Sequence, residues 1–213
     1  MRIVLFGPSG TLGQRIAREA LSRGHHVTGV ARDPAKAGTS HERMTFVQGE
    51  VRDAASVAHA SNGADAIVSA VAPTGGQPFS MLSEAARALI QGARRAGVKR
   101  LITVGGAGSL LVPEGGRVMD RPTFPVAWKP FAQAHADALD VYRTEGRGLD
   151  WTYFSPADVI EPGERTGRYR TGDDDLVVDA EGHSRISAED YAVALVDELE
   201  RPVHVARRFT AAY

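Results

Sequence analysis

With 213 residues, 43% of them hydrophobic and 24% charged, the chain has the composition of a soluble globular protein of one large or two small domains. Its net charge of −1 predicts no nucleic-acid partner and no anionic membrane surface as a partner. The absence of cysteine excludes a disulfide framework and a cysteine metal site. No leader pattern and no apolar run of membrane-spanning length is found, so we expect a cytoplasmic protein without a metal.

A glycine-rich turn follows the first predicted strand. Residues 3–6 are all apolar, as in a strand buried on both faces of a parallel sheet. Glycines spaced G-x-x-G-x-x-G come next, and residues 14–21 have the apolar spacing of a helix. This arrangement binds a dinucleotide pyrophosphate through free N–H groups and the helix dipole; the alternative is an ordinary βα turn. We assign the pyrophosphate site to Gly7, Ser9, Gly10, Thr11, Leu12 and Gly13.

The end of the second predicted strand, residues 26–31, indicates which dinucleotide binds. Arg32 follows it directly, and a guanidinium suits the 2′-phosphate of NADP, whereas an acidic residue there is typical of NAD sites. Asp33 is followed by Pro34, and this pair is typical of the start of a short helical turn. We therefore predict that Asp33 caps such a turn. The sequence therefore favours NADP(H), with NADPH preferred over NADH. The alternative is that Arg32 is a solvated arginine at the strand edge.

The next two predicted strands, residues 44–49 and 64–71, are expected to hold the middle of the cofactor. Glu50 and the backbone near Val51 come where an adenine could dock; the alternative is that the carboxylates in this segment are surface or capping groups. Small residues at the end of the fourth strand leave room for a ribose: Ala70, Val71 and Ala72.

A second glycine-rich loop follows the predicted strand over residues 99–104. Such a loop lies at the C-terminal edge of a parallel sheet, where open α/β sheets bind ligands. We expect Val104, Gly105 and Gly106 to face the nicotinamide, because glycine lets the backbone come close. Ser109 is a candidate to hold a substrate carbonyl, and the alternative is a turn serine.

A proline-rich segment, residues 112–130, comes before a predicted helix over residues 132–143. The prolines break any long element, and the aromatic residues Phe124, Trp128 and Phe131 predict a loop that covers a pocket. A strand over residues 149–154 follows. Its end and the next residues are expected at the nicotinamide end of the cofactor: Phe154, Ser155 and Pro156.

The pattern changes after residue 160. A loop and short strands precede a capping box at residues 187–190 and a helix over residues 191–199. The short strands are expected at residues 168–170, 176–178 and 183–186. Because no linker separates this region, we predict one domain over residues 1–213, in which residues 161–213 form a small substrate-side lobe.

Four segments together resemble the atypical short-chain dehydrogenase/reductases, in particular the NmrA-like, NAD(P)H-binding group that includes biliverdin-IXβ and flavin-reductase-like proteins. They are residues 7–13, 104–110, 149–156 and 186–192. The resemblance implies an α/β fold with a Rossmann-like, doubly wound parallel sheet. It also implies NADP(H) binding along the first six strands.

The chain departs from that family in its catalytic residues. Short-chain enzymes typically use Tyr-x-x-x-Lys, in which the lysine lowers the tyrosine pKa. No tyrosine here is followed four residues later by a lysine. His135, with Lys129 nearby, is a candidate proton donor near neutral pH, and the alternative is a partly exposed helix histidine.

These patterns predict an NADPH-dependent oxidoreductase that transfers hydride to a small organic acceptor, which is a flavin, a quinone or a carbonyl compound. The alternative is a non-catalytic NADP(H)-binding redox sensor. The missing Tyr/Lys pair argues against a sugar epimerase.

Overall fold

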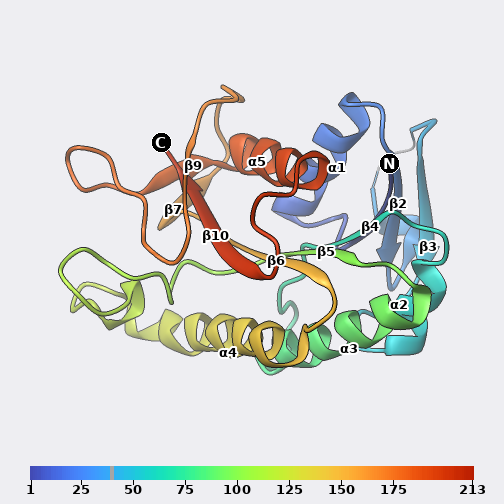
Figure 1. Ribbon diagram of the computed structural model, residues 1–213, viewed down its shortest axis with the longest axis horizontal. Coiled ribbons are helices and arrows are strands. Elements are labelled where there is room, and N and C mark those ends of the chain that lie inside the picture. Colours follow the sequence, from blue (N-terminus) through green and yellow to red (C-terminus); the bar gives the residue numbers. More distant parts are fainter. Residues whose placement is uncertain (39–40) are drawn as a thin grey trace.

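The computed structural model describes residues 1–38 and 41–213, and its centre is an eight-stranded sheet (Figure 1). The strand order is β3-β2-β1-β4-β5-β6-β10-β8, and neighbours pair in parallel except β10 with β8. The predicted Rossmann-like, doubly wound sheet is therefore confirmed. The strands are β1 (Arg2–Phe6), β2 (His26–Ala31), β3 (Met44–Gln48), β4 (Ala66–Ser69), β5 (Arg100–Val104), β6 (Asp150–Ser155), β7 (Val159–Glu161), β8 (Arg170–Gly172), β9 (Arg185–Ser187) and β10 (Arg207–Ala212).

Helices cover both faces of this sheet. α1 packs against α5 on one face, while α2, α3 and α4 lie side by side on the other (Figure 1). α4 begins three residues before the predicted start, because its Pro130 lies in the first turn, where proline is tolerated. The helices are α1 (Thr11–Ser22), α2 (Ala54–Ala60), α3 (Met81–Ala96), α4 (Lys129–Glu145) and α5 (Ala188–Glu200), with 3₁₀ turns η1 (Pro34–Lys36), η2 (Val118–Asp120) and η3 (Val126–Trp128).

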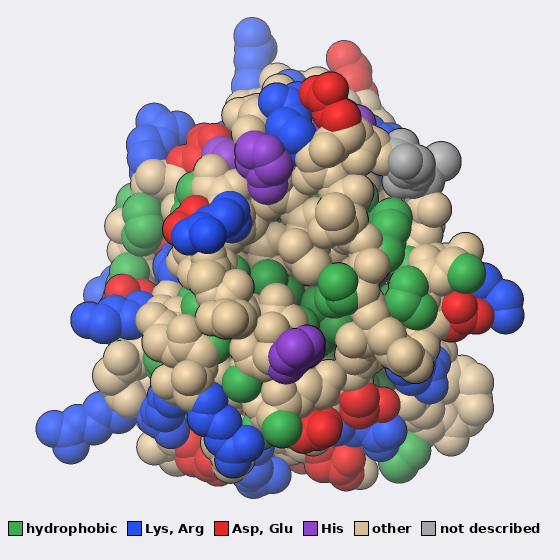
Figure 2. Space-filling model, turned by 90° about the vertical axis from the view of Figure 1, so that its right-hand side faces the viewer, with side chains coloured by type: hydrophobic (Ala, Val, Ile, Leu, Met, Phe, Trp, Pro, Cys, Tyr) green, Lys and Arg blue, Asp and Glu red, His purple; other side chains and the backbone are tan. Residues whose placement is uncertain are grey.

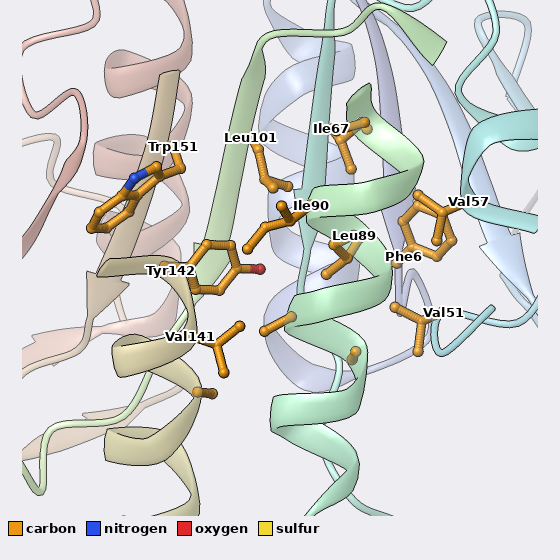
Figure 3. Packing of buried hydrophobic residues seen from close by; sticks show 14 of the residues in the cluster. Phe6, Val51, Val57, Ile67, Leu89, Ile90, Leu101, Val141, Tyr142 and Trp151 are labelled. Atoms are coloured by element: carbon orange, nitrogen blue, oxygen red, sulfur yellow. The ribbon is translucent and has the colours of Figure 1, made fainter. Parts of the chain in front are cut away.

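The central strand β1 divides the core between the two helical layers. Val4 and Phe6 pack towards α2, α3 and α4, whereas Ile3 and Leu5 pack towards α1 and α5. This alternation follows from the pleat, which points successive side chains to opposite faces. Figure 3 shows the first layer, in which Tyr142 of α4 lies beside aliphatic side chains of α3 and β5. Buried apolar side chains fill the space between the sheet and the helices on both faces, so the strand ends remain as the place for a ligand.

The two outer strands differ from the buried centre of the sheet. β3 forms one edge, and its residues are intermediate or exposed. Figure 2 views the molecule from the β3 side and shows basic and acidic side chains interspersed around the margin of that face. β8 is the other edge strand, and it is only three residues long. An edge strand as short as β8 limits pairing with another chain.

The C-terminal region joins the main sheet more fully than the sequence predicts. β10 pairs in parallel with β6, and α5 packs on α1, so both belong to the principal layers. Residues 176–178 form no strand, although Leu176 is buried. In the segment between β6 and α5, β8 belongs to the main sheet, whereas β7 pairs with β9 in a separate two-stranded sheet. In Figure 1 this segment (orange) and the loop after β5 (green) extend at the same end of the molecule.

Candidate functional site

A cavity of about 970 Å³ lies at the C-terminal ends of the parallel strands. Open α/β sheets bind ligands at this edge, where the strand order reverses between β1 and β4. Most residues that the sequence assigns to the cofactor or to catalysis line this one cavity. They are Gly7, Ser9, Gly10, Thr11, Leu12, Arg32, Val51, Ala70, Val71, Ala72, Val104, Gly105, Gly106, His135 and Pro156.

The three glycines of the first turn differ in whether packing requires them. Gly7 has φ +81°, and a Cβ there would lie 2.6 Å from the Ala70 carbonyl oxygen. Gly13 is buried away from the cavity wall, and its Cβ would lie 1.9 Å from the Gly7 oxygen, so it is needed for α1 to approach β1. A Cβ at Gly10 would lie 3.6 Å from the nearest atom. Packing leaves room for a side chain there, on the cavity side.

The N-terminus of α1 is left open to the cavity. Gly10 is the N-cap, and it offers no side-chain hydrogen bond to the first turn. That turn also contains no acidic residue. The first N–H groups of a helix have no intrahelical partner, and together with the helix dipole they favour a bound anion. This end of the cavity therefore has the chemistry of a phosphate site.

Arg32 and Asp33 have separate roles at the end of β2. Arg32 lines the cavity and is exposed, and its guanidinium has no ion-pair partner among the described residues. Asp33 accepts a hydrogen bond from Ala35 N at 3.2 Å and pairs with Lys36 Nζ at 3.1 Å. The predicted cap is thus confirmed. The carboxylate is committed to η1, and the guanidinium is the group that faces the cavity.

Glu50 is the acidic group beside Arg32 on the cavity wall. Burial by itself would raise the pKa of this carboxyl, but hydrogen bonds from Arg52 and the charge of Arg32 lower it overall. Arg52 Nε lies 3.2 Å from Glu50 Oε1. The side chain is therefore ionised at neutral pH and paired mainly with Arg52.

The glycines after β5 make space for two protein side chains. A Cβ at Gly105 would lie 2.2 Å from Tyr153 Cε1. A Cβ at Gly106 would lie 2.8 Å from His135 Cγ. The sequence predicts that these glycines allow the backbone to approach the nicotinamide. Both residues line the cavity, but the close approach that requires glycine is to Tyr153 and His135.

Two residues predicted at the end of β6 lie off the cavity wall. Phe154 is fully buried, and its ring stacks at 4.0 Å between the rings of Tyr191 and Phe209. Ser155 is also buried, and its hydroxyl has no partner in the described part of the chain. Strand alternation explains the position of Phe154, because it points this side chain into the α1–α5 layer and away from the cavity. Pro156, which follows the strand, does line the cavity.

Ser109 is also absent from the cavity wall, contrary to the catalytic role expected from the sequence. Its hydroxyl accepts a hydrogen bond from Arg208 Nη1 at 2.9 Å. Arg208 is a buried arginine of β10, and its Nη2 lies 2.5 Å from Asp174 Oδ1. Ser109 therefore holds the loop after β5 to β10 and to the turn after β8. The turn-serine alternative describes it better.

Ser109→Ala should accordingly reduce stability and leave the site intact. The substitution leaves one N–H of a buried guanidinium without its acceptor, which costs about 1–3 kcal/mol. We expect a lower free energy of unfolding in urea, with NADPH affinity as in the wild type. Asp174→Asn tests the same network from its other side and should also destabilise the fold. A Ser109→Ala variant of normal stability with impaired turnover would contradict this role.

His135 lines the cavity from the second turn of α4, and only 6% of its surface is exposed. Burial lowers the pKa of the imidazole to about 4, so the ring is neutral at pH 7. This does not support the proton donation near neutral pH that the sequence suggested. Lys129 is exposed at the start of α4 and is not on the wall.

The proline-rich segment forms one side of the cavity, as expected. Phe124, Trp128 and Phe131 all line it, and the Phe131 ring meets the His135 ring edge-on at 4.7 Å. Sequence reasoning missed Arg121 and Asp158, whose side chains approach within 3.8 Å across the same wall. Neither lies in a recognisable motif, and only the fold brings residues of the two loops together.

Two further properties of the described residues bear on the kind of site. Within residues 1–38 and 41–213, no group of three or more histidine, cysteine, aspartate or glutamate side chains could hold a metal ion. In the same part of the chain, no helix combines the length and apolar character needed to cross a bilayer.

Comparison with known proteins gives consistent matches. A family described as NAD(P)H-binding matches residues 7–202. Uncharacterized protein YwnB of Bacillus subtilis (strain 168) is 40% identical over 214 residues, which cover 99% of this chain and 97% of that protein. A Burkholderia pseudomallei structure, provisionally named an exported protein, is 46% identical with a TM-score of 0.90 and full coverage of both chains. A Streptococcus pneumoniae TIGR4 structure, provisionally named an NADH-flavin reductase, is 32% identical with a TM-score of 0.88, covering 100% of this chain and 99% of that one.

Proposed function

We propose, from the premise that this chain belongs to the NAD(P)H-binding family, that it is an NADPH-dependent oxidoreductase acting on a small organic molecule. The nicotinamide supplies a hydride when it is bound, and a flavin, a quinone or a carbonyl compound accepts it. One observation carries the proposal: a single cavity extends from the glycine turn before α1 to aromatic residues of α4 and the loop before it. A dinucleotide and a second small molecule can meet there.

The cofactor would be held mostly by backbone and by one cation. The open first turn of α1 suits the pyrophosphate, because its N–H groups have no side-chain cap. The small residues Ala70, Val71 and Ala72 leave space along the wall after β4. Arg32 forms no ion pair within the described residues, and its guanidinium suits a 2′-phosphate, which supports NADPH over NADH.

The second substrate would lie beside the aromatic side chains. Phe124, Trp128 and Phe131 offer flat apolar surfaces on which a planar ring packs well. The described wall contains neither a tyrosine nor a lysine, so a substrate that needs little acid catalysis from the protein fits best. Flavins and quinones meet that requirement, and a similar structure carries a flavin-reductase name. We further propose the cytoplasm as its compartment, since a chain without cysteine needs no oxidising environment.

The alternative is an NADP(H)-binding sensor without turnover, and the absence of a proton-donating tyrosine or lysine on the described wall favours it.

The oxidoreductase should oxidise NADPH when a flavin, quinone or aldehyde is added, as followed by the loss of NADPH absorbance. Gly10→Val, which should not bind the cofactor, is the matched negative control.

A sensor would give a different result in the same preparation. It would bind NADPH, turn over no acceptor of the panel, and bind a protein partner with an affinity that depends on the cofactor. Linkage requires that the partner change the NADPH affinity by the same factor. That combination of results would replace the oxidoreductase by the sensor.

A further inference from the structure

The hydrogen bonds of Tyr153 fix the tautomer of His135. The Tyr153 hydroxyl donates to the His135 carbonyl oxygen at 2.8 Å. The same hydroxyl oxygen lies 3.1 Å from His135 Nδ1. A hydroxyl has one hydrogen, and a carbonyl oxygen can only accept, so the Tyr153 hydroxyl hydrogen is used in the bond to the His135 carbonyl. Nδ1 must therefore carry the hydrogen of the second bond and donate it to the tyrosine oxygen.

The other ring nitrogen is consequently an acceptor. The imidazole is neutral at pH 7, because burial lowers its pKa to about 4. A neutral ring with a hydrogen on Nδ1 has a bare lone pair on Nε2. Nothing in the described part of the chain donates a hydrogen bond to this atom, and the ring belongs to the cavity wall. His135 thus offers a hydrogen-bond acceptor to a ligand.

The ring is also held in place by packing. Phe131, one turn earlier on α4, contacts it edge-on, and the Gly106 backbone lies so close that no Cβ would fit there. A fixed acceptor with a known protonation state discriminates between ligands, because a polar atom left unpaired in a closed site lowers affinity. A ligand with a hydrogen-bond donor at this point gains one bond. A ligand without a donor leaves Nε2 unpaired.

We propose that Nε2 of His135 accepts a hydrogen bond from an N–H or O–H group of the second substrate, so that the site selects planar hydride acceptors bearing such a donor. His135 is then a specificity residue, and Tyr153 is the residue that positions it. This inference rests on the proposed oxidoreductase function. A flavin, whose pyrimidine ring carries an imide N–H, belongs to the selected class, whereas an N-methylated flavin does not.

The test compares lumiflavin with 3-methyllumiflavin, which lacks the imide hydrogen. We expect the wild type to reduce lumiflavin with a kcat/KM about 5- to 10-fold higher, the effect of one hydrogen bond. His135→Phe should remove the preference, so that the two flavins have similar kcat/KM values. His135→Gln, whose amide oxygen can accept near the Nε2 position, should restore part of it. His59→Phe, at an exposed histidine of α2, is the matched control and should keep the preference.

Tyr153→Phe tests the positioning role, because it removes the acceptor of Nδ1 and keeps the aromatic ring. We expect a reduced ratio of kcat/KM for lumiflavin over 3-methyllumiflavin. ¹⁵N NMR of the wild-type ring at pH 7 should show Nε2 unprotonated and Nδ1 protonated. That measurement does not depend on activity.

Three results would overturn the proposal: a wild type without the preference, a protonated Nε2, or a His135→Phe variant that loses NADPH affinity and keeps the preference. The last result would indicate that Nε2 of His135 accepts a hydrogen bond from the cofactor and not from the second substrate. If no acceptor is reduced, the proposed function fails by itself. The ratio of the two flavin dissociation constants, measured by fluorescence quenching in wild type and His135→Phe, then decides whether Nε2 selects a donor.

Discussion

Gly10→Val should abolish NADPH binding while the chain remains folded. Gly10 has φ −71° and ψ 164°, an extended conformation that valine adopts readily. A Cβ there would lie 3.6 Å from the Gly7 oxygen and 3.8 Å from the Ala70 oxygen, which are ordinary contact distances. The added side chain would therefore enter the cavity at the open end of α1. Loss of two charge-assisted hydrogen bonds to phosphate, at about 1.5–3 kcal/mol each, weakens binding by roughly 10²- to 10⁴-fold.

Gly13→Ala is the contrasting variant for this experiment. Its Cβ would lie 1.9 Å from the Gly7 oxygen and 2.9 Å from the Gly7 carbonyl carbon, so α1 would have to move away from β1. We expect a lower melting temperature for Gly13→Ala and an unchanged one for Gly10→Val. Isothermal titration with NADPH measures the affinity of each. If Gly10→Val binds NADPH as the wild type does, the first turn is not the pyrophosphate site.

The order of strands and helices could be predicted because each central element repeats a simple pattern. β1 is apolar from Ile3 to Phe6 because both of its faces are covered there. Ser187 caps α5 by accepting a hydrogen bond from Asp190 N at 2.9 Å, as its capping box indicates. The NAD(P)H-binding family was predicted from four motifs and is confirmed. The place of β10 was less predictable. Its pairing with β6 depends on a return of the chain to the main sheet, which no local pattern encodes.

The site could be predicted where the backbone makes it, and less well where side chains do. Glycine turns and strand ends are fixed by chain direction, so the first turn and Arg32 do line the cavity. The direction of a side chain after a strand depends on its partners instead. Ser109 turns to Arg208, which is distant in sequence, and the burial of His135 depends on Gly106 and Phe131. These contacts come from tertiary packing and leave no mark in the local sequence.

Arg32→Ala should weaken NADPH binding strongly and NADH binding little. The guanidinium lines the cavity after β2, and the only carboxylate next in sequence, Asp33, is occupied by Ala35 N and Lys36. A charge-assisted hydrogen bond contributes about 1.5–3 kcal/mol, so we expect a loss of roughly 10- to 150-fold for NADPH. NADH lacks the 2′-phosphate and should lose less than about threefold, since it keeps every other contact. Titrations of both cofactors against the wild type and the variant measure the two ratios.

Two controls separate this contact from a general effect of charge. Arg95→Ala removes the same charge from an exposed position of α3, outside the cavity wall, and should leave both affinities unchanged. Added salt should weaken NADPH binding to the wild type more than to Arg32→Ala, because screening acts on the contact that the variant lacks. Equal losses of NADPH and NADH affinity in Arg32→Ala would show that the residue supports the cavity without reading the 2′-phosphate. The preference for NADPH would then have to come from another group near Gly49 and Glu50, or would be absent.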